Sequence, residues 1–215
     1  MTLEYIIEIC VAIDIAILGI AYPIIIDKIS NIGDKYSSEY IPVVFNDEFP
    51  QKALIGKISV FKLTLFVTLF SFIFLIFQIN PPFGWDNWFI NNSAKLTVFA
   101  LTTLQIIFFF IWLGEVALYN GKSKSLLTHL IKNYNKAKAD TEIQNYHLKA
   151  INELAFYAIE KQDEHLQETL LEFYYGVFAD IRRKHDKSKP LVYPIDLYFL
   201  VSKLNEIAVE NENKA

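Results

Sequence analysis

The chain has 215 residues, of which 53 % are hydrophobic and 20 % are charged, and its formal net charge is −4 at pH 7. The negative charge argues against a dedicated nucleic-acid binder, and the 18 Phe and 12 Tyr rings argue against a disordered chain, because rings need burial. The charges are also unevenly distributed, since residues 58–119 contain four and residues 120–215 contain 28. This distribution excludes one ordinary soluble domain and predicts a membrane protein with a polar C-terminal region.

Three segments are long and apolar enough to cross a bilayer, which takes about 20 residues in a helix. They are residues 5–26, 58–79 and 95–118. The first segment lacks the basic start of a signal peptide, so we interpret it as a retained transmembrane helix. The sequence therefore predicts an all-α integral membrane protein, with a transmembrane domain over residues 1–120 and a cytoplasmic helical domain over residues 121–215.

Lysines between and after the predicted spans indicate the orientation of the chain. The connection over residues 27–57 contains four lysines and the start of the C-terminal domain contains five, whereas the residues before the first span contain none. Lys and Arg concentrate on the cytoplasmic side of membrane proteins. We therefore predict a multi-pass protein with its N-terminus outside, and with the connection and the C-terminal domain in the cytoplasm.

The C-terminal domain shows a helical pattern throughout. Apolar residues recur at intervals of three and four over residues 141–162, 163–185 and 195–210. Thr141 and Asp163 are suitable N-cap residues for the first two of these helices. Because each helix has one apolar face, we expect the helices to pack on one another.

Asp14 is the most informative residue of the first predicted span, because an acid near the centre of a bilayer costs a few kcal/mol and is a candidate for function. On a helical wheel it lies nearly opposite a face of small residues about 60° wide. If that face packs against another span, Asp14 faces a second protomer, a water-filled pore or lipid. Alternatively, Asp14 hydrogen-bonds a Thr or Ser of a neighbouring helix, or the segment does not span. The predicted packing face consists of Ala12, Ala16, Gly19 and Pro23.

Further polar residues lie in or beside the predicted spans. Glu4 and Glu8, one turn apart at the outer end of the first span, are either the mouth of a pore or interfacial acids. Thr102 and Gln105 share one side of the third span and can bond across helices. The second span carries a polar stripe within about 80° of the wheel, which either lines an aqueous path or bonds to helix carbonyls. The stripe consists of Thr64, Thr68, Ser71 and Gln78.

Motifs for catalysis or cofactor binding are not found in the sequence. It contains no Gly-rich phosphate loop, no His-Glu-x-x-His motif and no cluster of Cys and His. The single cysteine, Cys10, excludes an intramolecular disulfide. We therefore expect neither an enzyme nor a bound metal or cofactor.

Two functional hypotheses follow. The first is a homo-oligomeric membrane channel or pore for cations, lined by Asp14 and the polar stripe and assembled or gated by the C-terminal helices. The alternative is a membrane-anchored scaffold, sensor or complex subunit whose cytoplasmic helical domain binds a protein partner. Burial of Asp14 against the other two spans would argue against the channel. Exposed apolar surface on the helices after Thr141 would favour the alternative.

Overall fold

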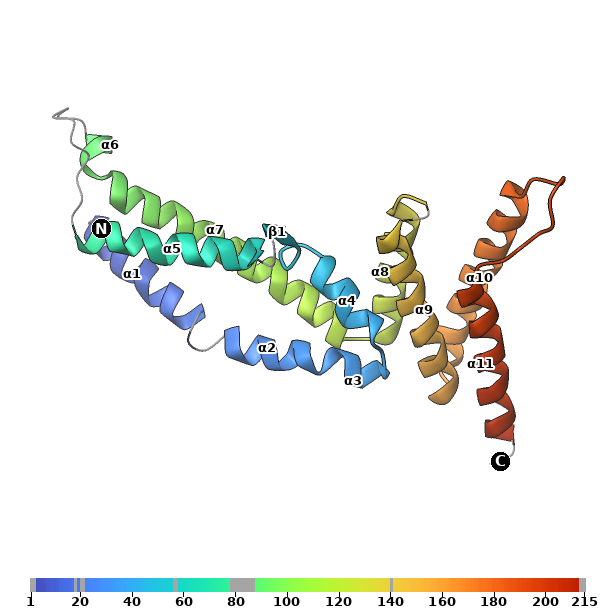
Figure 1. Ribbon diagram of the computed structural model, residues 1–215. Helices are drawn as coiled ribbons and strands as arrows, with labels where there is room; N and C mark the ends of the chain where they lie inside the picture. The colour runs from blue at the N-terminus through green and yellow to red at the C-terminus, as the bar shows by residue number, and fades with distance from the viewer. Residues whose placement is uncertain are drawn as a thin grey trace. The chain divides into compact units, whose positions relative to one another are not determined.

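The computed structural model describes residues 3–17, 19, 22–55, 58–77, 88–139 and 141–212 (Figure 1). The chain divides into two compact units, the N-terminal unit and the C-terminal unit. The N-terminal unit contains Met1–Ser30 and Phe45–Ala117, and the C-terminal unit contains Asn31–Val44 and Leu118–Ala215. The sequence pattern did not predict that Asn31–Val44 belongs with the C-terminal helices.

Helices make up almost all the regular structure of the described residues, as expected. The one exception is a short ribbon in which two strands pair antiparallel, with Ala53 opposite Ser59 and Ile55 opposite Ile58. The elements in chain order are α1 (Leu3–Ala16), α2 (Tyr22–Ser30), α3 (Ile32–Tyr36), α4 (Tyr40–Asp47), β1 (Ala53–Ile55), β2 (Ile58–Ser59), α5 (Val60–Ile76), α6 (Trp88–Asn91), α7 (Ser93–Asn120), α8 (Ser123–Lys136), α9 (Glu142–Glu160), α10 (Glu164–Lys184) and α11 (Ile195–Glu212).

Among the described residues, one helix is long and apolar enough to cross a membrane, and that helix is α7. Its 28 residues give a length of about 42 Å, which exceeds the hydrocarbon core of about 30 Å. Only 22 % of its apolar window is buried inside the chain, whereas the core helix of a soluble protein is mostly buried. The third predicted span is therefore supported as a candidate membrane span.

The other two predicted spans are not supported as transmembrane helices. In residues 5–26 the structure describes two α-helical parts, α1 up to Ala16 and α2 from Tyr22, with Ile17 and Gly19 in π-helical conformation between them. The 14 residues of α1 reach about 21 Å, which is less than the hydrocarbon core. Pro23, which lacks an amide donor, lies in the first turn of α2. In the second predicted span, residues 58–79, the described helix is α5, which has 17 residues.

The C-terminal unit is built around α9, against which α8, α10 and α11 pack. Both predicted N-caps are confirmed. The Gln144 amide donates to Thr141 Oγ1 at 3.3 Å, and the Leu166 amide donates to Asp163 Oδ1 at 3.1 Å. The apolar faces of the four helices form the core of the unit, which includes Leu126, Leu127, Leu130, Ile151, Leu154, Leu166, Leu170, Leu197 and Leu200.

Glu153 of α9 attaches the segment Asn31–Val44 to the C-terminal unit. Its carboxylate accepts a hydrogen bond from the hydroxyl of Ser38. It also accepts from the amide of Tyr40 at 3.0 Å and from the amide of Glu39 at 3.3 Å. The Tyr40 amide belongs to the first turn of α4, where amide donors have no partner within the helix. One carboxylate therefore satisfies three donors at the start of α4.

A second set of contacts holds α3 in the same unit. Lys35 Nζ donates to the carbonyl oxygens of Asn120 at 2.8 Å and of Gly121 at 2.6 Å. These carbonyls lie at the C-terminal end of α7, where a cation is electrostatically favourable. The ring of Tyr36 meets that of Tyr157 on α9 edge-on, with centroids 5.1 Å apart. The segment is thus fixed by polar and aromatic contacts together.

Replacing Tyr174 by Phe is expected to lower the free energy of unfolding of the C-terminal unit by about 1–2 kcal/mol. The Tyr174 hydroxyl donates to Asn152 Oδ1 at 2.7 Å, and both side chains are buried, so the change leaves the amide oxygen without a donor. Burial also raises the pKa of the Tyr174 hydroxyl. Urea unfolding of the full chain, followed by circular dichroism, measures the loss. Tyr175→Phe, at an exposed position of the same helix, should change stability by less than about 0.5 kcal/mol.

Candidate functional site

Asp14 is buried inside the N-terminal unit and does not face away from its neighbours. Its side chain is 3 % exposed, and its Oδ2 accepts a hydrogen bond from the hydroxyl of Thr102 on α7 at 2.8 Å. The premise of the channel hypothesis, that Asp14 points away from the rest of its own chain, is therefore wrong. The geometry is the one expected for an aspartate bonded to a threonine of a neighbouring helix.

The small-residue face of the first segment is exposed, so the predicted packing of this face against the other spans is wrong. Ala12, Ala16, Gly19 and Pro23 are all exposed, and a Cβ atom added at Gly19 would meet no atom within 4 Å. The reason is the hydrogen bond between Asp14 and Thr102, which turns the acidic side of α1 toward α7. The small residues on the other side then have no packing partner within the chain.

The polar stripe of α5 is only partly described, and its described threonines bond to their own helix. Thr64 Oγ1 donates to the carbonyl of Val60 and Thr68 Oγ1 donates to the carbonyl of Thr64, both at 2.9 Å. Both threonines are buried. Ser71 lies in α5, but its side chain is outside the described part, and Gln78 lies outside the described residues altogether. The described geometry matches the alternative of helix-carbonyl bonding.

Glu4 and Glu8, the predicted mouth of the pore, lie on the exposed surface of α1. Lys95 Nζ of α7 lies 3.6 Å from Glu4 Oε1, so one of the two acids forms an ion pair between helices. Exposed ion pairs of this kind contribute little to stability. The pair indicates which ends of α1 and α7 lie together.

Three helices of the N-terminal unit enclose a buried polar cluster, which we define as Asp14, Thr68, Thr102 and Gln105. Asp14, Thr68 and Gln105 line a cavity of about 10 Å³, whose other walls are Ile17, Leu65 and Leu69. Gln105 is 2 % exposed, and neither of its amide atoms has a hydrogen-bond partner; the same holds for Asp14 Oδ1. The sequence identified each of these four polar residues, but it did not predict that they lie together in the fold.

The N-terminal unit exposes many large apolar side chains and buries a polar cluster within its core. In soluble proteins the opposite pattern is the usual one, whereas polar residues of membrane helices turn toward the bundle interior. α5 and α7, which run beside α1 (Figure 1), carry many exposed rings and branched apolar chains. The exposed apolar residues on these two helices include Phe66, Phe70, Ile73, Phe99, Ile107 and Phe110.

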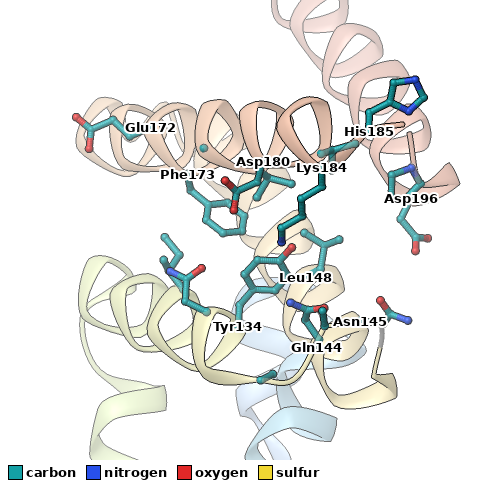
Figure 2. Close-up of a pocket in the computed structure, with 18 of the residues that line it drawn as sticks. Tyr134, Gln144, Asn145, Leu148, Glu172, Phe173, Asp180, Lys184, His185 and Asp196 are labelled. Atoms are coloured by element: carbon teal, nitrogen blue, oxygen red, sulfur yellow. The ribbon is translucent and has the colours of Figure 1, made fainter. Parts of the chain in front are cut away.

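A groove of about 960 Å³ lies in the C-terminal unit between α8, α9 and α10 (Figure 2). The ring centroids of Tyr134 and Phe173, on two of its walls, are 5.3 Å apart. Two of the ionisable side chains at the groove have local partners: Asp180 pairs with Arg183 at 2.7 Å, and His185 Nε2 lies 2.7 Å from the carbonyl of Lys189. The groove is also lined by Glu172, Lys184 and Asp196.

A second side of α10 carries an exposed surface of apolar and acidic residues, which we call the α10 face, and Glu172 lies at the edge between this side and the groove. Leu171 is 70 % exposed and Tyr175 is 80 % exposed, and their spacing of four places both on one side of the helix. Three exposed glutamates lie on or beside this side, and one of them pairs with His165 at 3.8 Å. The α10 face therefore consists of Glu164, Glu168, Leu171, Glu172 and Tyr175.

Comparisons with known proteins supply no relative from which a function can be transferred. No protein-family model, no curated protein and no solved structure matches the chain. Function is therefore inferred from the residues and their geometry.

Proposed function

We propose that this chain is a membrane-anchored protein whose C-terminal unit binds a partner protein through the α10 face. The observation that carries the proposal is the exposure of Leu171 and Tyr175, two large apolar side chains on one side of a helix. Exposed apolar residues grouped in this way mark interaction surfaces. Exposed apolar surface on the helices after Thr141 is also the feature expected of an anchored interaction module and not of a channel.

The anchor is the N-terminal unit, with α7 as its membrane-spanning helix. Its exposed apolar side chains and its buried polar cluster suit hydrocarbon surroundings. α1 and α5 contribute polar groups to the same buried cluster as α7, so we place them beside α7 at membrane depth. Five lysines between Lys122 and Lys138 follow α7, and the positive-inside rule then puts the C-terminal unit in the cytoplasm.

The partner is a basic amphipathic helix. Glu164, Glu168 and Glu172 give the α10 face a local negative charge, so a complementary surface supplies Lys or Arg side chains. Leu171 and Tyr175 lie next to these acids on the same side of the helix. The partner must therefore present apolar side chains to them. Tyrosine is also among the residues that most often dominate the binding energy of an interface. A helix with one apolar and one basic side meets both requirements.

The channel hypothesis is less well supported by the same structure. It requires Asp14 to line a path shared between protomers, whereas Asp14 lies against Thr102 of its own chain. The homo-oligomer stays a prediction, and the exposed small-residue face of α1 is the surface through which a second copy would pack.

A synthetic helix of Leu and Lys tests the partner chemistry. We expect a fluorescent peptide of about five turns to bind the full chain in zwitterionic nanodiscs. Tyr175→Glu should weaken binding at least tenfold, about 1.4 kcal/mol, because it replaces the largest apolar contact with a charge. Fluorescence anisotropy measures the affinities, and empty nanodiscs give the lipid background.

Two controls decide between specific docking and adhesion to apolar surface. Ile195→Glu removes an equally exposed apolar side chain from α11 and should leave the affinity unchanged. A peptide of the same pattern with Glu in place of Lys should bind at least tenfold more weakly. Equal binding of the two peptides, or equal loss with Ile195→Glu, would contradict the α10 face as the docking surface.

A further inference from the structure

The end of α10 and its connection to α11, residues 182–195, carry a dense group of basic side chains. We call this segment the basic loop. It contains five Lys and Arg side chains and one acid, in a chain whose net charge is −4. Arg182, Arg183 and Lys184 lie in the last turn of α10, where the helix dipole favours cations. Lys187 and Lys189 lie beyond the end of the helix, so the dipole does not account for them.

The acids nearest to the basic loop are engaged by other groups. Asp180 pairs with Arg183 at 2.7 Å. Asp186 Oδ1 accepts hydrogen bonds from the amide of Ser188 at 3.0 Å and from its hydroxyl at 2.8 Å, and these bonds lower the pKa of Asp186. Four exposed basic side chains of the loop form no ion pair within the described part of the chain, and these are Arg182, Lys184, Lys187 and Lys189.

Exposed apolar side chains follow the basic ones directly in the same loop. Val192 is 70 % exposed and Ile195 is 80 % exposed, and Leu191 beside them is exposed as well. The ring of Tyr193 packs edge-on against that of Phe178 on α10, with centroids 5.1 Å apart, and so holds the loop to the helix. The loop between α10 and α11 projects from these helices (Figure 1). Basic and apolar groups are therefore presented together on one held segment.

We propose that the basic loop binds the anionic lipid headgroups of the cytoplasmic leaflet. Lys187 and Lys189 contact the charged headgroups, and Val192 and Ile195 enter the boundary between headgroups and acyl chains. Attraction to anionic lipid and burial of apolar area are the two contributions that together hold a protein surface at a membrane. The proposal rests on the anchor of the proposed function, which keeps the C-terminal unit near that leaflet and raises the effective concentration of lipid.

An anionic lipid surface suits the basic loop better than an acidic protein does. Protein interfaces are enriched in aromatic residues and Arg and depleted in Lys. In the basic loop, the cations beyond the helix are lysines, and the exposed apolar side chains are aliphatic. Lysine is a flexible point charge that needs no fixed geometry opposite it, which matches headgroups that move within a leaflet.

Quenching of a dye by labelled lipid tests the contact. Val192→Cys in a Cys10→Ser background carries a small environment-sensitive dye, and the full chain is placed in nanodiscs whose lipids include a nitroxide quencher near the headgroup. We expect quenching to be at least about fivefold stronger in discs containing phosphatidylserine than in zwitterionic discs. Salt at about 1 M should remove most of the difference, because the Debye length falls to about 3 Å.

Two double variants and one single variant separate the loop from the charge of the whole unit. Lys187→Gln with Lys189→Gln should lower the ratio of docked to undocked loop about 25-fold, because each Lys near an anionic surface contributes about fivefold. Lys161→Gln with Lys203→Gln removes the same charge elsewhere in the unit and should leave quenching unchanged. Ile195→Ser keeps every charge and should lower the ratio about threefold or more. Equal effects of the two double variants would overturn the proposal.

The remaining outcomes distinguish the lipid contact from the dye and from the anchor. The same dye at Tyr175→Cys, an equally exposed position on the α10 face, should stay unquenched in both kinds of disc. Equal quenching at positions 175 and 192 would mean that the dye enters lipid by itself and would overturn the proposal. A chain that co-elutes only with anionic discs would support the lipid contact and contradict the anchor. An unquenched dye at position 192 in a chain held by anionic discs would overturn the proposal and favour an acidic protein as partner of the basic loop.

Discussion

Replacing Ile107 by Asp is expected to reduce membrane insertion of α7 by more than a hundredfold. Ile107 lies in the middle of α7 and is 50 % exposed on the apolar surface of the N-terminal unit. On the insertion scale, Asp at the centre of a span is about 3 kcal/mol less favourable than Ile, and each 1.4 kcal/mol corresponds to a factor of ten. The fraction of the chain that resists alkaline extraction from membranes measures the effect.

The control for this change lies in the C-terminal unit. Tyr175→Asp replaces an even more exposed apolar side chain, but at a position that we place in water, so the chain should stay in the membrane fraction. If α7 were the surface helix of a soluble protein, Ile107→Asp would be as harmless as the control. A wild-type chain that alkaline buffer extracts completely would contradict α7 as a span before any variant is made.

Local features of the structure were predictable from the sequence. The caps Thr141 and Asp163 were identified because a capping side chain bonds to an amide only three residues ahead. α7 was identified because it is mostly apolar and carries no charged residue over more than five turns. In each case the information lies within a window of a few turns.

The face that α1 buries was not predictable from its own sequence. A helical wheel places Asp14 and the small residues on opposite sides, but both a polar contact and close backbone packing are plausible reasons for burial. Only the position of Thr102, 88 residues further along the chain, decides in favour of the acid. The prediction that the small residues pack inward was wrong for this reason.

Glu153→Ala is expected to lower the free energy of unfolding of the C-terminal unit by about 2–3 kcal/mol. The change leaves the hydroxyl of Ser38 and the amides of Glu39 and Tyr40 without their acceptor. Hydrogen bonds to a charged group contribute about 1.5–3 kcal/mol each, but the sum is smaller because the Glu39 amide is exposed to water. Urea unfolding of the full chain, followed by circular dichroism, measures the loss.

Limited proteolysis shows whether the loss arises at this contact. Once Glu153 is removed, the segment Asn31–Val44 should open locally, so trypsin should cleave at Lys35 faster than in the wild type. Glu160→Ala is the matched control, because Glu160 is an exposed acid of the same helix whose ion pair with Lys161 spans 4.0 Å. Glu160→Ala should lower the free energy of unfolding by less than about 0.5 kcal/mol and leave the cleavage rate at Lys35 unchanged. Equal effects of the two changes would mean that Glu153 contributes only surface charge, and the attachment of the segment would then rest on Lys35 and Tyr36.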